Sequence, residues 1–447
     1  MKFKNRTFLN SPLILTMRLF GVFPINPDTL ECSRFDVIYC GCLGVLSILE
    51  LLYTPVFIIH QKDKLVPANF PATTTIMFIQ STITSIAARY TALHRVIKYF
   101  PRINDNIIKT TSLLYTHSLA DEKYKRERAL LINRLLCIFI FVGVVGLNVN
   151  RVQCFIRMSE IIGDTIYFVY FIMFQNSAVL LIEIMFLRTV AQLNLNFSKI
   201  NKELELILEE TELFEKQAQR LMCKVEGAEK VNKDDKSSSR MTSTTHGHPI
   251  RSPYVWPSSG KSCDSTLKLN IEMVGTPEIF PMNTLSRLKR LFFLHIQCSE
   301  AVESSNSLFE VQLLFSVFRL FCVSFLVVYQ HLSRYVEYGF AYTVLIYVYI
   351  FFIILRSTLL TSSTGCTISE AQYTKVLITK INNRFLDVDT KEELDLFWEH
   401  ITSSKLEFTA CGFFTLNTRL IASAFVAGTT YLVILLQFNP EKQNMVS

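Results

Sequence analysis

Seven long apolar stretches alternate with polar segments along the 447-residue chain. A helix needs about 20 mostly apolar residues to span a bilayer, and each stretch meets that requirement. The pattern therefore predicts an all-α membrane protein with seven transmembrane helices. The predicted spans are residues 36–60, 67–93, 131–150, 165–187, 311–333, 338–356 and 412–438.

Lys and Arg residues near the span ends predict the orientation, because cytosolic loops carry an excess of them. The loops that would lie outside are sparse in basic residues, and the C-terminal tail carries only Lys442. The N-terminus is therefore expected in the cytosol and the C-terminus outside, the reverse of a G-protein-coupled receptor. The basic residues of the first 35 positions and of the connection between spans two and three are Lys2, Lys4, Arg6, Arg18, Arg34, Arg95, Lys98, Arg102, Lys109, Lys123, Lys125, Arg126 and Arg128.

Composition agrees with a membrane protein. Charged residues make up 19% of the chain, against about 25% in soluble domains, and the mean hydropathy is +0.30. The net charge of +7 comes from basic residues beside apolar segments, so a nucleic-acid partner is not expected. The eleven cysteines include no CxxC pair, and the chain has no phosphate-binding loop, GxSxG or HExxH motif. We expect no enzyme activity, metal or cofactor. A signal peptide is also not expected, since Pro12 and Arg18 interrupt the first apolar patch.

Three polar segments outside the spans carry apolar residues at helical spacing. Such stripes predict helices that pack on a partner, either within one subunit or between subunits as a cytosolic bundle. Between the first two stripes, residues 232–282 are rich in Ser, Thr, Pro and Gly, so a disordered insertion is expected, with His246 and His248 as loop residues rather than metal ligands. The stripes are Phe197, Ile200, Leu204, Ile207, Thr211, Phe214, Ala218 and Leu221; Leu285, Leu288, Phe292, Ile296, Val302 and Phe309; and Leu394, Phe397, Trp398 and Ile401.

The last span ends with Thr430-Tyr431, five apolar residues and Gln437-Phe438. This pattern resembles the C-terminal signature of insect gustatory receptors, and Cys411–Asn417 resembles the family's approach to its pore helix. The resemblance implies a ligand-gated, nonselective cation channel whose pore is made by the last helix of four subunits. Gln437 and Phe438 would form the gate, with Thr430 and Tyr431 on the same helix. A hydrophobic ring closes a pore by excluding water, and an amide ring helps an ion shed its hydration.

The same resemblance places a ligand among the outer halves of spans two to six. Aromatic faces with a few amides suit a small-molecule tastant, either a sugar or a bitter compound. Tyrosines at a bilayer boundary are also common as interfacial anchors, and that alternative stays open. The candidate ligand-binding residues are Asn148, Tyr167, Tyr170, Gln175, Tyr329, Gln330, His331, Tyr342 and Tyr347.

Five ionisable residues fall within the predicted spans. A charge that faces lipid is costly, so these side chains are expected to be paired, interior or at the interface. All except Glu50 fall toward the cytosolic side, and we interpret those four as coupling or packing residues. The five are Glu50, Arg89, Glu183, Arg319 and Arg356.

The expected function is that of a gustatory receptor in the plasma membrane of sensory neurons, as a homotetramer or a heteromer with other gustatory receptors. An odorant receptor is the nearest alternative. A metabotropic receptor would need the opposite orientation, and a secondary transporter would need inverted repeats. The predicted organisation is a cytosolic segment 1–35, transmembrane helices 1–4 over 36–187, cytosolic extensions 188–310, transmembrane helices 5–6 over 311–356, cytosolic anchor helices 357–411, a pore helix 412–438 and an extracellular tail 439–447.

Overall fold

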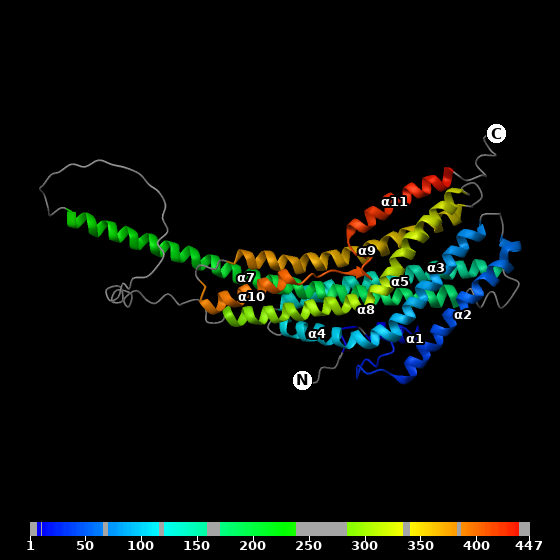
Figure 1. Ribbon diagram of the computed structural model, residues 1–447, viewed down its shortest axis with the longest axis horizontal. Coiled ribbons are helices and arrows are strands. Elements are labelled where there is room, and N and C mark those ends of the chain that lie inside the picture. The colour runs from blue at the N-terminus through cyan, green and yellow to red at the C-terminus, as the bar shows by residue number, and fades with distance from the viewer. Residues whose placement is uncertain are drawn as a thin grey trace. The chain divides into compact units, whose positions relative to one another are not determined.

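The computed structural model of the chain (Figure 1) describes residues 7–9, 11–65, 70–115, 120–158, 170–237, 284–333, 340–381 and 386–437. The chain divides into two compact units. Unit 1 comprises residues 1–202, 292–375 and 401–447, and unit 2 comprises residues 203–291 and 376–400.

Seven long helices correspond to the seven predicted spans. Three of them are far longer than a bilayer requires: α7 has 62 residues, α8 has 50 and α9 has 41, whereas about 20 residues suffice to cross. These lengths are consistent with the prediction that some helices continue beyond the membrane. The seven are α2 (Arg34–Leu65), α3 (Phe70–Tyr90), α5 (Ala120–Met158), α7 (Asn176–Ser237), α8 (Thr284–Ser333), α9 (Phe340–Lys380) and α11 (Thr418–Gln437).

Among the described residues, six of these helices contain a stretch long and apolar enough to cross a membrane; α3 is the helix without one there. The described part of α3 buries the small hydroxyl residues Ser81, Thr82, Thr84 and Ser85 against the rest of the chain. On α2, α5 and α11 large apolar side chains are exposed instead, as expected for helices that face lipid. Examples are Phe35, Ile38, Leu52, Leu131, Ile138, Val142, Val426 and Tyr431.

The N-terminal segment contains a short helix, α1 (Ser11–Leu19), that the sequence analysis did not predict. It ends in a Schellman motif, in which Val22 N–H donates to the Met17 carbonyl and Gly21 N–H to the Arg18 carbonyl, both at 2.9 Å. The Phe20 and Gly21 carbonyls accept hydrogen bonds from Arg89 of α3. A cation at a helix C-terminus is favourable, so the end of α1 satisfies a buried charge of the transmembrane unit.

Gly21→Ala is expected to destabilise the protein by about 1–3 kcal/mol. Gly21 has φ +62°, and an added Cβ would lie 2.6 Å from Leu43 Cδ1 and 3.2 Å from the Arg89 guanidinium. Thermal unfolding of the purified protein measures the loss. Gly41→Ala is the matched control, because a Cβ there meets nothing within 4 Å; equal stability of the two variants would contradict the account.

The described residues of unit 1 include two π-helical turns. η1 (Thr91–Val96) joins α3 to α4 (Ile97–Tyr115), and η2 (Tyr170–Gln175) leads directly into α7. π-Helical turns are rare in proteins, and those that do occur are often found at functional sites. Arg95 of η1 forms a salt bridge with Glu310 of α8 at 2.8 Å, which ties this turn to the bundle.

The predicted apolar stripes are largely buried within one chain. The first is almost fully buried from Phe197 to Thr211, and it becomes partly exposed at Phe214 and Ala218. Burial in a single chain supports packing within one subunit for the first part of the stripe. Leu288, Val302, Phe309, Leu394 and Phe397 are also buried, whereas Trp398 is 42% exposed.

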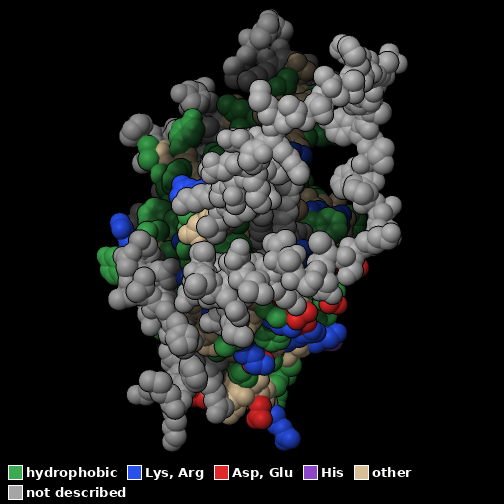
Figure 2. All heavy atoms as spheres, turned by 90° about the vertical axis from the view of Figure 1, so that its left-hand side faces the viewer, with side chains coloured by type: hydrophobic (Ala, Val, Ile, Leu, Met, Phe, Trp, Pro, Cys, Tyr) green, Lys and Arg blue, Asp and Glu red, His purple; other side chains and the backbone are tan. Residues whose placement is uncertain are grey.

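Unit 2 contains the distal part of α7, the start of α8 and most of α10 (Val388–Ser403). Arg287 of α8 donates to both oxygens of Glu210 on α7 at 2.9 and 2.8 Å. Asp387 caps α10 by accepting from Thr390 N–H, and hydrogen bonds from Thr390 lower the pKa of Asp387 below its usual range. Figure 2 shows basic and acidic side chains together on the face that lies at the left of Figure 1, as suits a surface in water.

The last helix begins later than predicted. Cys411–Asn417 does not start the helix but forms most of a β-hairpin, in which β1 (Thr409–Ala410) pairs antiparallel with β2 (Phe414–Thr415). Its turn places Cys411 at φ +50° and Gly412 at φ +75°, values that an α-helix does not allow. Asn417 then caps α11, since Leu420 N–H donates to its side-chain oxygen at 3.1 Å.

The predicted insertion lies largely outside the described residues. α7 runs to Ser237, five residues past the predicted start at 232, and residues 238–283, with His246 and His248, are not described. Among the residues that the structure does describe, no group of three or more His, Cys, Asp or Glu side chains is placed to hold a metal ion.

Candidate functional site

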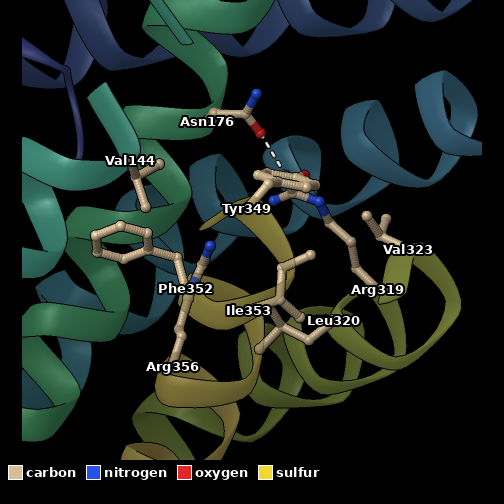
Figure 3. A pocket seen from close by; sticks show the side chains of 9 residues that line it. All are labelled: Val144, Asn176, Arg319, Leu320, Val323, Tyr349, Phe352, Ile353 and Arg356. Atoms are coloured by element: carbon tan, nitrogen blue, oxygen red, sulfur yellow. Dashed lines mark hydrogen bonds between the residues drawn. The ribbon is translucent and has the colours of Figure 1, made fainter. Parts of the chain in front are cut away.

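A small cavity lies between α5, α7, α8 and α9 within unit 1 (Figure 3). Its volume is about 30 Å³, room for about two water molecules. A drug-sized ligand needs roughly 300 Å³ or more, so binding would require these helices or their side chains to move. The lining residues are Val144, Asn176, Arg319, Leu320, Val323, Tyr349, Phe352, Ile353 and Arg356.

A buried ion pair closes one side of the cavity. Arg356 of α9 donates through Nε and Nη2 to the two carboxylate oxygens of Glu183 on α7, with an Nη2–Oε1 distance of 2.6 Å. The side chains are 9% and 2% exposed. A bidentate pair of this kind fixes both helices in register. The expectation that charged residues within the spans are paired is thus confirmed for these two.

A second polar link crosses three helices. Arg319 of α8 donates to the Asn176 side-chain oxygen at 2.5 Å, and Ser81 of α3 donates to the same oxygen at 3.2 Å. Figure 3 shows the Arg319 and Asn176 side chains meeting beside Tyr349. Asn176 is the first residue of α7, directly after the π-helical turn η2, so that turn sets where its amide points.

The preceding residue, Gln175, joins a different set of helices. Its Nε2 donates to Ser47 Oγ at 2.7 Å and Glu50 Oε2 at 3.0 Å, and it lies 3.2 Å from the Tyr170 hydroxyl. Its Oε1 accepts from Ser85 of α3. Gln175 is fully buried, so its amide is already occupied by protein groups. Adjacent residues of η2 and α7 therefore connect α2 and α3 to the cavity.

Of the nine predicted ligand residues, the four whose side chains the structure describes do not line this cavity. Gln175 and Tyr170 belong to the buried polar cluster, Tyr329 is partly exposed on α8, and Tyr347 is 56% exposed on α9. Tyr167 lies outside the described residues. Asn148, Gln330, His331 and Tyr342 fall in α5, α8 and α9, with side chains that are not described. Asn176, Tyr349 and Phe352 line the cavity and were not predicted as ligand residues. The signal for Asn176 was its position next to Gln175 in an apolar span.

Phe352 forms one wall of the cavity and packs directly over Gly143 of α5. A Cβ added at Gly143 would overlap the Phe352 ring, which also lies 5.4 Å from the Phe139 ring, centroid to centroid. Glycine at this position is therefore what allows α5 and α9 to approach each other.

Gly143→Ala is expected to push Phe352 into the cavity and to destabilise the protein by about 1–3 kcal/mol, the usual cost of overpacking. Thermal unfolding measures the loss. Gly146→Ala lies one turn further along α5, where a Cβ meets nothing within 4 Å. We expect no loss of stability in that control, and a similar loss in both variants would contradict the packing argument.

The β-hairpin connects the cavity helices to α11. Thr409 N–H donates to Asn306 Oδ1 of α8 at 2.8 Å, and Asn306 Nδ2 donates to Thr409 Oγ1 at 3.2 Å. Thr364 of α9 donates to the Leu416 carbonyl at 2.8 Å. On the α7 side, the rings of Phe186 and Phe408 lie edge to face at 5.6 Å. All three long helices thus hold the segment from which α11 starts.

α11 itself packs very little against the rest of the chain, and none of its 18-residue apolar window is buried. It meets α8 at Gly428, where an added Cβ would overlap the Phe325 ring, and at Phe425, whose ring packs edge to face on the same side chain at 6.5 Å. Thr430, Tyr431 and Gln437 are exposed. Phe438 lies outside the described residues.

The helical bundle, its buried polar links and its exposed apolar helices are those of a multi-pass membrane protein. The family model described as 7tm chemosensory receptor matches residues 11–442, so the chain belongs to this family. The relationship implied by the C-terminal motif is therefore confirmed at the level of the family.

Individual relatives agree with this assignment. The chain is 32% identical over 88 residues to gustatory and pheromone receptor 32a of Drosophila melanogaster, a match that spans 20% of this chain and 19% of that protein. The fold is similar to that of the insect olfactory receptor OR5 from Machilis hrabei, with TM-scores of 0.60 for one structure and 0.62 for the complex with eugenol. Sequence identity to both is 12%, with 96% of this chain and 97% of theirs covered.

Proposed function

We propose that the chain is a subunit of a gustatory receptor that acts as a ligand-gated, nonselective cation channel in the plasma membrane of sensory neurons. A small-molecule tastant, a sugar or a bitter compound, would bind among the transmembrane helices and open a pore made by α11 of four subunits. The observation that carries the proposal is α11, an apolar helix with none of its apolar window buried in its own chain. A helix that is held at its start and packs on its own chain mainly at Phe425 and Gly428 suits a pore assembled from several copies.

The polar groups along α11 support a pore-lining role. Thr430 and Gln437 are spaced seven residues apart, two helical turns, so both fall on one face. A ring of glutamine amides carries no net charge, and it should select weakly among cations. Phe438, the next residue, would supply the hydrophobic constriction of the closed state.

The links from the cavity to α11 support gating by ligand. A ligand opens a channel when it binds the open state better than the closed state. Expansion of the cavity would displace α8 and α9, and Asn306 and Thr364 connect these helices to the hairpin that precedes α11. At about 30 Å³ the cavity would have to enlarge when a tastant binds.

Two features favour a gustatory over an odorant receptor. The Thr430-Tyr431 and Gln437-Phe438 pairs resemble the gustatory signature, and a protein similar over 88 residues is a gustatory and pheromone receptor. The odorant alternative is retained because the solved structures of similar fold are those of an olfactory receptor, one of them with eugenol bound.

Whole-cell recording from cells that express this chain tests the proposal. Sugars and bitter compounds are applied beside volatile odorants, with Gln437→Ala and Phe438→Ala in parallel and surface labelling of each variant. A tastant-evoked cation current that both substitutions alter supports the proposal. Currents evoked only by volatile odorants favour the odorant receptor. A current that neither substitution changes would exclude these residues from the gate.

A further inference from the structure

Two arginines of neighbouring helices lie close together without a carboxylate between them. Arg188 of α7 donates from Nη1 to the Leu130 carbonyl of α5 at 3.2 Å. Leu130 precedes Arg134 by one helical turn on the same face of α5, and helical side chains lean toward the N-terminus. The two guanidinium groups are close enough to repel each other. Among the residues that the structure describes, neither arginine has a carboxylate partner, and Arg134 Nε is buried without a hydrogen bond.

The burial of Arg188 makes this arrangement costly. The residue is 6% exposed, and a buried charge without an opposite charge is unfavourable. Repulsion from Arg134 adds to that cost. Arg356, at a similar level of burial, is instead neutralised by the Glu183 carboxylate. An anion from outside the chain would therefore stabilise the Arg134–Arg188 pair.

The pair lies where α5 and α7 reach the predicted cytosolic boundary of the membrane. Cys137 of α5 and Ile184 of α7 belong to one apolar cluster, and Arg134 and Arg188 follow about one turn further toward that boundary. Arg134 is in the first turn of the predicted third span, and Arg188 directly follows the fourth. With the predicted orientation, both guanidinium groups lie at the depth of the phosphates of the inner leaflet.

The surface of α5 beside the arginines is suited to acyl chains. Large apolar side chains on this part of the helix are each more than half exposed, as expected for a helix that faces lipid. A lipid could therefore lie along α5 while its head group reaches the arginines. The exposed side chains are Leu131, Ile132, Leu135, Ile138, Phe139 and Val142.

We propose that Arg134 and Arg188 bind the phosphate group of an anionic phospholipid of the inner leaflet. Guanidinium groups match phosphate oxygens in geometry, and hydrogen bonds between the two ions are strong. Basic pockets between transmembrane helices on the cytosolic side are known to bind anionic head groups. Choline would neutralise the phosphate within its own head group, so a lipid of net negative charge is favoured over phosphatidylcholine. Neither arginine lines the cavity between α5, α7, α8 and α9, and the site does not depend on the proposed channel.

The experiment measures thermal unfolding of the purified full-length protein in nanodiscs of dioleoylphosphatidylcholine, with and without dioleoylphosphatidylglycerol. These lipids share their acyl chains and differ in net charge. We expect phosphatidylglycerol to raise the Tm of the wild type, because a ligand that binds the folded state stabilises it. Arg134→Gln should lose most of this rise, and Arg134→Lys should keep part of it. In native mass spectrometry, Arg134→Gln should weaken the apparent affinity for phosphatidylglycerol by about tenfold or more.

Arg128→Gln is the matched control. It removes the same charge from an exposed position of α5, and the Tm rise with phosphatidylglycerol should stay as in the wild type. The neutral nanodiscs provide a second check. Because Arg134→Gln removes a repulsion, it should be at least as stable as the wild type in phosphatidylcholine alone. A clear loss of stability there would show that Arg134 is already stabilised by the protein and would overturn the inference.

Two further results would also overturn it. A rise in Tm that Arg134→Gln and Arg128→Gln change to the same extent would reflect the general attraction of basic residues to an anionic membrane. A rise on addition of inorganic phosphate to neutral nanodiscs that requires Arg134, with no effect of phosphatidylglycerol, would assign the pair to a soluble phosphate instead of a lipid.

Discussion

Glu183→Gln is expected to remove most folded protein from the cell surface. The substitution leaves the Arg356 guanidinium, whose side chain is 9% exposed, without its carboxylate partner inside the bundle. Breaking a buried ion pair by removing one partner costs about 3–5 kcal/mol, a large share of the stability of any protein. Surface labelling and thermal unfolding in detergent measure the effect.

Two controls distinguish the loss of the buried ion pair from the loss of a charge at any other position. Asp105→Asn removes the partner of Lys109 in a pair whose side chains are more than half exposed, and we expect a change below about 1 kcal/mol. The double variant Glu183→Gln with Arg356→Met removes both charges and is expected to recover much of the surface expression. Failure of the double variant to recover would show that the residues matter for something other than their mutual neutralisation.

Asn306→Ala is expected to disconnect ligand binding from channel opening. The variant loses both hydrogen bonds between Asn306 of α8 and Thr409 of the hairpin. Coupling energies between sites are typically about 1–3 kcal/mol, so the ligand concentration for half-maximal current should rise by roughly 5- to 150-fold. Concentration–response curves of whole-cell current measure this shift beside ligand binding to the purified protein.

Asn306→Asp is the matched control for this prediction. Its carboxylate still accepts from Thr409 N–H, and the Thr409 hydroxyl can turn to donate to it. We expect near wild-type responses from this variant. A normal response of Asn306→Ala would show that the hairpin does not transmit the opening signal.

The sequence predicted the membrane helices because their signal is local and additive. About twenty consecutive apolar residues decide the outcome at each span, whatever lies elsewhere in the chain. The stripe from Phe197 to Thr211 was predicted in the same way, from a periodicity that one helix carries by itself. The spans and the stripe could both be predicted because the residues that determine them are close together in the sequence.

Features that depend on distant residues could be predicted only in part. The sequence marked Glu183 and Arg356 as residues that must be paired, but their separation of 173 positions gave no sign that they pair with each other. Gln175 was predicted to contact ligand because it is an amide in the outer half of a span, where the family resemblance places the ligand. Its actual partners, Ser47, Glu50 and Ser85, come from two other helices.

The start of the last helix was misplaced for a physical reason. Apolar content continues through Phe413 and Phe414, and hydropathy alone extends the span back to residue 412. The signals against a helix were present in Gly412, which takes a positive φ, and in Asn417, a favoured N-cap residue. The hairpin that results is the segment that joins the cavity helices to α11.

The most direct test of a pore formed by α11 is the reversal potential of the ligand-evoked current with calcium outside and a monovalent cation inside. Gln437→Glu would place a ring of carboxylates where the wild type has amides, and we expect the reversal potential to shift toward higher relative calcium permeability. Gln219→Glu, the same charge change on an exposed position of α7, should leave it unchanged. An unchanged reversal potential in Gln437→Glu, with normal surface expression and current, would contradict the account, because an ion that passes a ring of side chains must sense its charge.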